Sequence, residues 1–202
     1  MYRTVLLIVS LLVFNSLVSK PAIADDEAEI RSAFFSLQQA FLARDSNQAL
    51  GLISSDTKDY YRMLSKLAAN SQSLEQLAGQ HLTPLNLMML KYAKSNIPKS
   101  FWIDMAKSNP DKLLKLAVDK GLGSKELTDN VRLGKIELSG VTAAGKLVKG
   151  TQVMPVQLGF QKEAGQWKVS LLSMFEQANN LAEKFLKKSG LKIEDLEKMV
   201  VK

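Results

Sequence analysis

Few side chains in this chain could do acid–base or metal chemistry. Its 202 residues include one histidine, His81, and no cysteine. A catalytic triad or a general base needs a histidine that a carboxylate orients, and the nearest acid upstream of His81 is Glu75. A zinc site needs several converging ligands, of which one histidine supplies only one. We therefore expect His81 in a loop or at a helix end, with no catalytic residue and no metal site.

The motifs that would name a reaction are also missing from the sequence. It contains no P-loop, no dinucleotide-binding glycine fingerprint, no EF-hand loop and no nucleophile elbow. The absence of cysteine excludes thiol catalysis, disulfide exchange and cysteine-ligated zinc. We expect a protein that is not an enzyme and uses no cofactor.

The first 24 residues have the pattern of a secretory signal peptide. Arg3 supplies a positive charge, Val5–Val18 is mostly apolar, and Ala22-Ile23-Ala24 is a small-x-small cleavage site. The apolar run is shorter than the roughly 20 residues that span a bilayer. We expect cleavage after Ala24, a periplasmic or secreted location, and a single domain over residues 25–202.

The chain is basic, with 27 Lys and Arg against 20 Asp and Glu. Such a charge suits anionic lipid or acidic polymers, but lysine-rich helix faces also occur simply for solubility. Arginine does not cluster with aromatic residues, so we expect no nucleic-acid partner. Four acids, Asp25, Asp26, Glu27 and Glu29, follow the cleavage site, and we expect them to be solvated at a frayed terminus.

Apolar periodicity predicts an α+β fold. Spacings of three and four predict helices over residues 25–130, the clearest at Glu27–Arg44. The period then changes to two over residues 131–172, which predicts an antiparallel meander of three or more strands. The alternation shifts at Gly134, which indicates a β-bulge. We expect N-terminal helices packed on a curved antiparallel sheet, with C-terminal helices over residues 173–201.

Turns and caps divide the second half of the chain. The expected turns are Ala143-Ala144-Gly145 and Glu163-Ala164-Gly165, with a long extended stretch from Lys146 to Gln161 between them. Gly150 and Pro155 indicate a bend in this stretch or an edge position that faces solvent. Ser173 and Glu176 form a capping box, and Gly190 ends that helix. The helix residues expected to face inward are Phe175, Ala178, Leu181, Ala182 and Phe185. A last short helix is expected over Ile193–Val200.

Two stretches resemble the nuclear transport factor 2-like superfamily, a cystatin-like cone that includes SnoaL-like proteins. They are "FLARDSNQALGLIS" and "VMPVQLGFQKEAGQWKVSLLSM". A third stretch, "LSMFEQANNLAEKFLKKSGLKIEDLEKM", is similar to the end of the periplasmic phospholipid-shuttle (MlaC) family, from which no site residue is carried over. The resemblance implies a cone-shaped sheet on a long helix.

Such a cone implies an apolar concavity between the first helix and the sheet. Its expected lining, which could equally fill the core, is Phe34, Leu37, Phe41, Met154, Val156, Leu158 and Phe160. Met88 and Met89 suit either a pliant binding surface or the core. Superfamily enzymes combine an acid with a tyrosine inside the cone, as Asp59, Tyr60 and Tyr61 would; Asp59 near a helix start also suits a surface acid.

Lysines gather in the expected C-terminal helices. Lys184, Lys187, Lys188 and Lys192 are candidates for contact with an anionic membrane surface. The alternative is a solvated face, because Glu183, Glu194, Asp195 and Glu197 lie among them.

These observations predict an exported, non-catalytic binding domain. The cleft between the first helix and the sheet would take an apolar small molecule, a lipid or a protein partner, with at most peripheral membrane contact. The alternatives are a periplasmic phospholipid carrier and an uncharacterised enzyme with the cone fold. Loss of turnover on changing His81 or Asp59 to alanine would support the enzyme.

Overall fold

The computed structural model describes residues 22–70, 83–96, 101, 111–121 and 127–191. Its elements are α2 (Ala22–Ala43), α3 (Ser46–Leu52), α4 (Ser55–Asn70), α6 (Pro84–Asn96), α8 (Lys112–Asp119), β1 (Val131–Ser139), β2 (Thr142–Lys149), β3 (Gln152–Glu163), β4 (Gln166–Ser170) and α10 (Leu172–Ser189). The expected α+β class is confirmed. His81, Lys192 and the expected helix over Ile193–Val200 lie outside the described residues.

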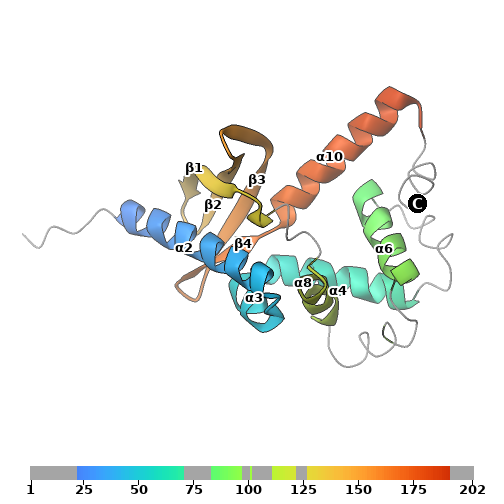
Figure 1. Ribbon diagram of the computed structural model, residues 1–202, viewed down its shortest axis with the longest axis horizontal. Coiled ribbons are helices and arrows are strands. Elements are labelled where there is room, and N and C mark those ends of the chain that lie inside the picture. The colour runs from blue at the N-terminus through green and yellow to red at the C-terminus, as the bar shows by residue number, and fades with distance from the viewer. Residues whose placement is uncertain (1–21, 71–82, 97–100, 102–110, 122–126, 192–202) are drawn as a thin grey trace, which may run out of the picture.

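The sheet lies at one end of the molecule, against α2, and α10 runs from it toward the other end, where α6 lies (Figure 1). Its four antiparallel strands follow chain order, β1-β2-β3-β4. The pairing of β1 with β2 shifts between Leu133 and Ile136, which confirms the bulge expected at Gly134. The turn at Ala164-Gly165 is also confirmed, with φ values of 47° and 80°.

The expected hairpin turn at Ala143–Gly145 is wrong, because these residues lie inside β2. The chain turns earlier, at Gly140, where φ is 60°. Close packing, not a turn, requires glycine at position 145, because a β-carbon there would lie 2.7 Å from Leu133 Cδ2 and 3.2 Å from Phe160 Cε2. The expected extended stretch is likewise two strands, since Gly150 turns the chain between β2 and β3 with φ 59°.

Helix α2 packs on the inner face of the sheet. Its buried side chains join those of the strands in one core, which includes Ile30, Phe34, Leu37 and Phe41 from α2 and Leu133, Leu147, Leu158, Phe160 and Val169 from the strands. Polar contacts fix the helix against β1. Arg31 donates to the bulge carbonyls of Leu133 and Gly134, both at 2.9 Å. These bonds satisfy carbonyl groups that the bulge removes from the ladder.

Asp26 is not the solvated acid expected from the sequence. Its Oδ1 accepts hydrogen bonds from Lys162 Nζ at 2.6 Å and from Trp167 Nε1 at 2.8 Å. The side chain is 22% exposed. The reason is that a buried indole N–H needs an acceptor, and α2 places Asp26 over the β3–β4 hairpin where Trp167 lies. Asp26 follows Ala24, so cleavage at the expected position would leave this anchor in the chain.

The Asp26 contacts predict a specific acid dependence of stability. Hydrogen bonds from Lys162 and then Trp167 lower the pKa of Asp26 below its ordinary value. A group whose pKa is lowered by folding stabilises the folded state above its unfolded pKa, and this contribution is lost as the pH falls through the folded pKa. At neutral pH, the wild-type protein should therefore unfold at a higher urea concentration than the Asp26→Asn variant. The difference between the two unfolding midpoints should shrink as the pH falls below 3.8. Asp25→Asn, at an exposed position, is the control; an Asp26→Asn difference that does not change with pH would contradict the prediction.

Candidate functional site

The structure divides the seven residues expected to line a pocket into two groups. Phe34, Leu37, Phe41, Leu158 and Phe160 are each 5% exposed or less and belong to the core. Met154 and Val156 are partly buried and pack against that core from β3. The contact surface between α2 and the sheet is therefore filled by side chains, and the partly exposed positions lie near the start of β3.

Strand β3 is irregular at these two positions. Lys146 pairs with Gln157 and Val148 pairs with Val153, so residues 154–156 stand opposite Leu147 alone. Pro155, in the middle of this segment, has no N–H to donate to a ladder. Pro155, where the sequence predicts a bend or an edge position, thus lies in an irregular segment of the kind that bends a strand, and the pairing with β2 resumes at Val153.

Helix α10 covers the edge of β3 that β4 leaves open. The pairing of β3 with β4 begins at Gly159, so Gln157 lies beyond the end of β4. Gln157 N–H donates to Gln177 Oε1 at 2.9 Å, and Gln157 O accepts from Ser173 Oγ at 3.2 Å. Side chains of α10 thus replace the missing strand. The capping box expected at Ser173 and Glu176 is wrong for this reason: Ser173 binds β3, and no side chain caps α10 at Leu171.

The opposite side of α10 contacts the helical layer. The Phe175 ring stacks on Tyr60 at a centroid distance of 5.1 Å and meets Tyr61 edge-on at 6.0 Å. Farther along, Asn179 Oδ1 accepts the N–H of Leu85, at the start of α6, at 3.4 Å. Helix α10 is therefore held by β3 on one side and by α4 and α6 on the other.

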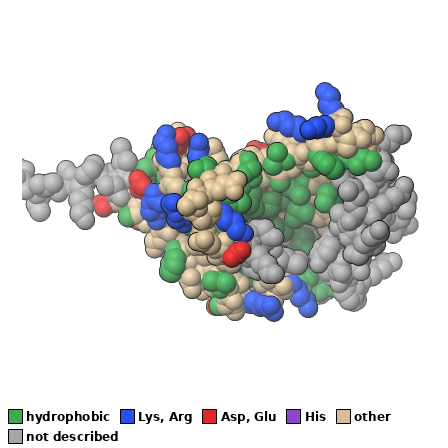
Figure 2. Space-filling view, turned by 45° about the horizontal axis from the view of Figure 1, so that its top comes forward, with side chains coloured by type: hydrophobic (Ala, Val, Ile, Leu, Met, Phe, Trp, Pro, Cys, Tyr) green, Lys and Arg blue, Asp and Glu red, His purple; other side chains and the backbone are tan. Residues whose placement is uncertain are grey.

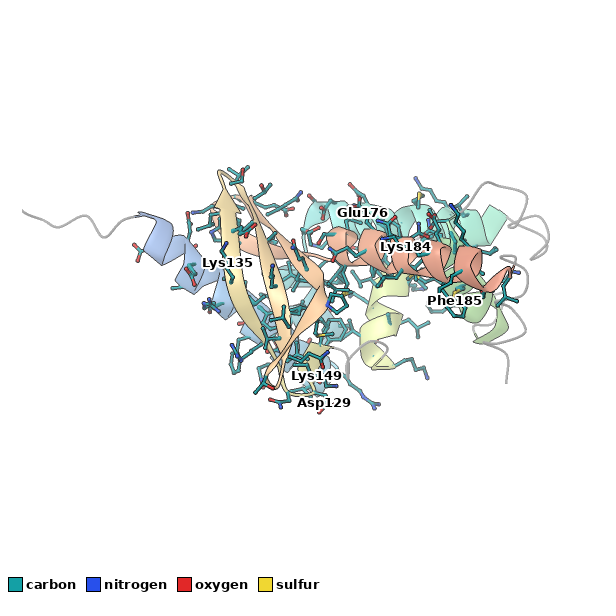
Figure 3. All side chains as sticks on the ribbon, turned by 90° about the horizontal axis from the view of Figure 1, so that it is seen from above. Asp129, Lys135, Lys149, Glu176, Lys184 and Phe185 are labelled. Carbon is teal, nitrogen blue, oxygen red and sulfur yellow. The ribbon has the colours of Figure 1, made fainter. Side chains whose placement is uncertain are left out.

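Between these two sides, α10 presents an apolar stripe that is partly buried at its start and exposed toward its end. It consists of Met174, Ala178, Leu181 and Phe185, which follow one another at spacings of four, three and four residues and so share one helix face. The expectation that Leu181 and Phe185 point inward is wrong, because each is 49% exposed. In Figure 3, Phe185 lies on the opposite side of α10 from Glu176.

The space-filling view shows a hollow beneath α10, beside the strands, with hydrophobic side chains on its surface (Figure 2). Helices α4, α6 and α10 and strand β3 also carry hydrophobic side chains that are only partly buried and pack on the core. These are Tyr60 of α4, Met89 of α6, Met154 and Val156 of β3, and Met174 and Phe175 of α10. A concave surface with hydrophobic side chains is typical of sites that take apolar ligands. Below, "the α10 hollow" means this concavity.

Tyr60 and Tyr61 of α4 share no hydrogen-bond partner with Asp59. Burial raises the pKa of Tyr60 to about 12, and burial followed by the nearby Tyr60 raises the pKa of Tyr61 further above its ordinary value. Both are neutral phenols at pH 7. The Tyr60 hydroxyl donates to Asn86 Oδ1, whereas Asp59 forms a surface ion pair with Arg62 at 2.8 Å. The acid and the tyrosines thus bind different partners.

The three described lysines of the expected membrane-contact set are all exposed on α10. Lys187 and Lys188 lie in its last turn, before Gly190, which ends the helix with φ 67° as expected. Lys184 lies one turn earlier. Across the described ranges, no group of three or more His, Asp or Glu side chains could hold a metal ion. No helix within those ranges is long and apolar enough to span a bilayer.

Comparison of the chain with models of protein families, with curated proteins and with solved structures finds no match. The resemblance to the nuclear transport factor 2-like superfamily, like the weaker one to the phospholipid-shuttle family, therefore stays a prediction from the sequence. The sequence reasoning missed Met174 and Gln177. The spacing from Met174 to Phe185 was readable as one apolar stripe, but the attachment of Gln177 to Gln157 depends on a tertiary contact that no local pattern reveals.

Proposed function

We propose that this protein is a non-catalytic binding domain that takes the apolar chain of a small amphipathic molecule into the α10 hollow. The observation that supports the proposal is the apolar stripe from Met174 to Phe185, which lies between two attached sides of α10 and is exposed at Leu181 and Phe185. Burial of such a stripe by a ligand is favourable by about 25 cal/mol for each Å² of apolar surface removed from water. The leader pattern supports a location outside the cytoplasm.

Phospholipid is the ligand class that a second observation favours. Lys184 and Lys188 follow Leu181 and Phe185 by three residues each, so their ammonium groups lie beside the apolar stripe. An acyl chain in the α10 hollow would bring an anionic head group near these lysines. The alternatives are a free fatty acid, which has the same chemistry, and an apolar segment of a protein partner.

The proposal predicts that filling the α10 hollow removes binding. Ala178 is the small residue of the stripe, and Ala178→Trp should weaken binding of a fluorescent fatty-acid analogue by about ten-fold or more, since a loss of roughly 1.4 kcal/mol is ten-fold in affinity. Fluorescence titration measures the affinity, and circular dichroism checks the fold. Asn180→Trp, at an exposed position on the other side of α10, should bind like wild type.

Two results would contradict this function: equal affinity in wild type and Ala178→Trp, or equal loss in both tryptophan variants. Mass spectrometry of the organic extract of purified protein then identifies the natural ligand. Phospholipid in the extract would support the phospholipid-carrier function. A fatty acid would identify free fatty acid as the ligand instead.

A further inference from the structure

The distal half of α10, from Leu181 to Ser189, combines exposed apolar and basic side chains. Leu181 and Phe185 are each 49% exposed. Lys184 and Lys188 lie on the neighbouring strip of the helix because each follows one of them by three residues. Figure 3 shows Lys184 between the sides that carry Glu176 and Phe185. Exposed apolar side chains bordered by lysines are typical of helices that lie in a membrane interface.

The charge of this half-helix comes from three lysines and one acid. Within the described part of the chain, no acid forms an ion pair with Lys184, Lys187 or Lys188. The single acid between Leu181 and Ser189 is Glu183, whose Oε1 accepts a hydrogen bond from Asn179 at 2.8 Å. Three described lysines outside α10 do form ion pairs, among them Lys149, which binds Asp129 at 3.0 Å. Long lysine side chains can also lay their methylene groups along apolar surface while the ammonium group stays in water.

We propose that the distal half of α10 docks this protein on an anionic lipid surface. Leu181 and Phe185 enter the interfacial region, and Lys184 and Lys188 beside them contact head-group phosphates, while Lys187 adds to the positive charge at the end of the helix. The attached half of α10, from Leu172 to Asn179, stays on β3 and the helical layer, so docking needs no rearrangement of the core. This docking stands without the ligand proposed above, and it would place the mouth of the α10 hollow against the bilayer.

Vesicle flotation of the purified full chain tests the docking. Binding is expected to vesicles of phosphatidylglycerol and phosphatidylcholine in equal parts, and not to phosphatidylcholine alone. Each lysine near an anionic leaflet contributes roughly five-fold to binding. The triple variant K184Q/K187Q/K188Q should therefore bind roughly a hundred-fold more weakly, and K184R/K187R/K188R should bind like wild type.

The matched control removes the same charge elsewhere. Lys66, Lys120 and Lys146 are exposed on α4, after α8 and on β2. K66Q/K120Q/K146Q should retain most of the binding, because these lysines lie off the docking face. In a Phe185→Trp variant, the emission should shift to the blue on anionic vesicles. Equal binding to both vesicle types, equal loss in the two triple variants, or no shift in emission would overturn the proposal. Fatty-acid titration is a separate readout, so failure of docking and failure of ligand binding are distinguishable.

Discussion

Replacement of Phe160 by alanine is expected to lower the free energy of unfolding by about 4 kcal/mol. Phe160 is 1% exposed, pairs with Ala143 of β2 and Val169 of β4, and lies over Gly145. Its removal leaves a cavity in the centre of the sheet that neighbours can fill only in part, so lost transfer energy and cavity energy add. Urea denaturation followed by far-UV circular dichroism measures the change.

Met154→Ala is the matched control on the same face of β3. Met154 is only partly buried, so we expect a loss of about 1 kcal/mol. Ligand affinity should fall for Met154→Ala, which removes part of the proposed lining. If the two variants lose equal stability, then Phe160 is not a core residue in solution, and the division of the expected pocket residues into core and lining is wrong.

This division shows where sequence reasoning stops. Alternation along β3 correctly places Met154, Val156, Leu158 and Phe160 on one face, because the side-chain period of a strand is two. It does not show how far α2 extends along that face, and this determines which of the four are covered. Coverage is set by the bulge at 154–156 and by the crossing of α2. The crossing depends on contacts between segments more than 100 residues apart in the sequence, such as the bond from Arg31 to the Leu133 carbonyl.

The sequence correctly predicts features that depend on the conformation of a few neighbouring residues. The bulge at Gly134, the turn at Ala164-Gly165 and the end of α10 at Gly190 each follow from backbone conformations that glycine or a shift of period indicates. Gly145 misled because a glycine can mark a turn or a close approach of side chains. Asp26 misled because its acceptor role depends on Trp167, 141 residues later.

The side of α10 that stays uncovered is a further feature that sequence could not determine. The apolar residues of α10 occupy a wide sector of its circumference, and the sequence predicts that the whole sector is buried. In the structure, Gln177 attaches one border to β3 and Asn179 attaches the other to α6, while Leu181 and Phe185 between them remain exposed. The candidate site is therefore the exposed part of the apolar face of α10, between its attachments to β3 and to α6.

A buried polar network joins the start of α4 to the junction of β4 and α10, and Asp56 is its shared acceptor. Asp56 Oδ2 accepts from Ser170 Oγ at 2.8 Å, and Asp56 Oδ1 accepts from Ser54 Oγ. The Thr57 hydroxyl lies 3.2 Å from Asp56 Oδ1 and accepts the Leu171 N–H at 2.9 Å. Ser54 and Thr57 are fully buried. The network thus fixes the first residue before α10, and through it the position of Phe175 against Tyr60.

We expect Asp56→Ala to lower the free energy of unfolding by about 2 kcal/mol, because the Ser170 hydroxyl loses its acceptor and a buried donor without one costs about 1–3 kcal/mol. The Ser54 hydroxyl can still donate to the Val169 carbonyl at 3.0 Å, so its bond is replaced. Asp59→Ala is the control on the same helix: the Asp59 side chain is 68% exposed and pairs with Arg62 at the surface, so its loss should change stability by no more than about 0.5 kcal/mol. Urea denaturation measures both. Asp56→Ala should also weaken fatty-acid binding, since α10 is then less firmly placed above its hollow. Equal stability of the two variants would mean that the hydroxyls find other acceptors, and that Asp56 does not position α10.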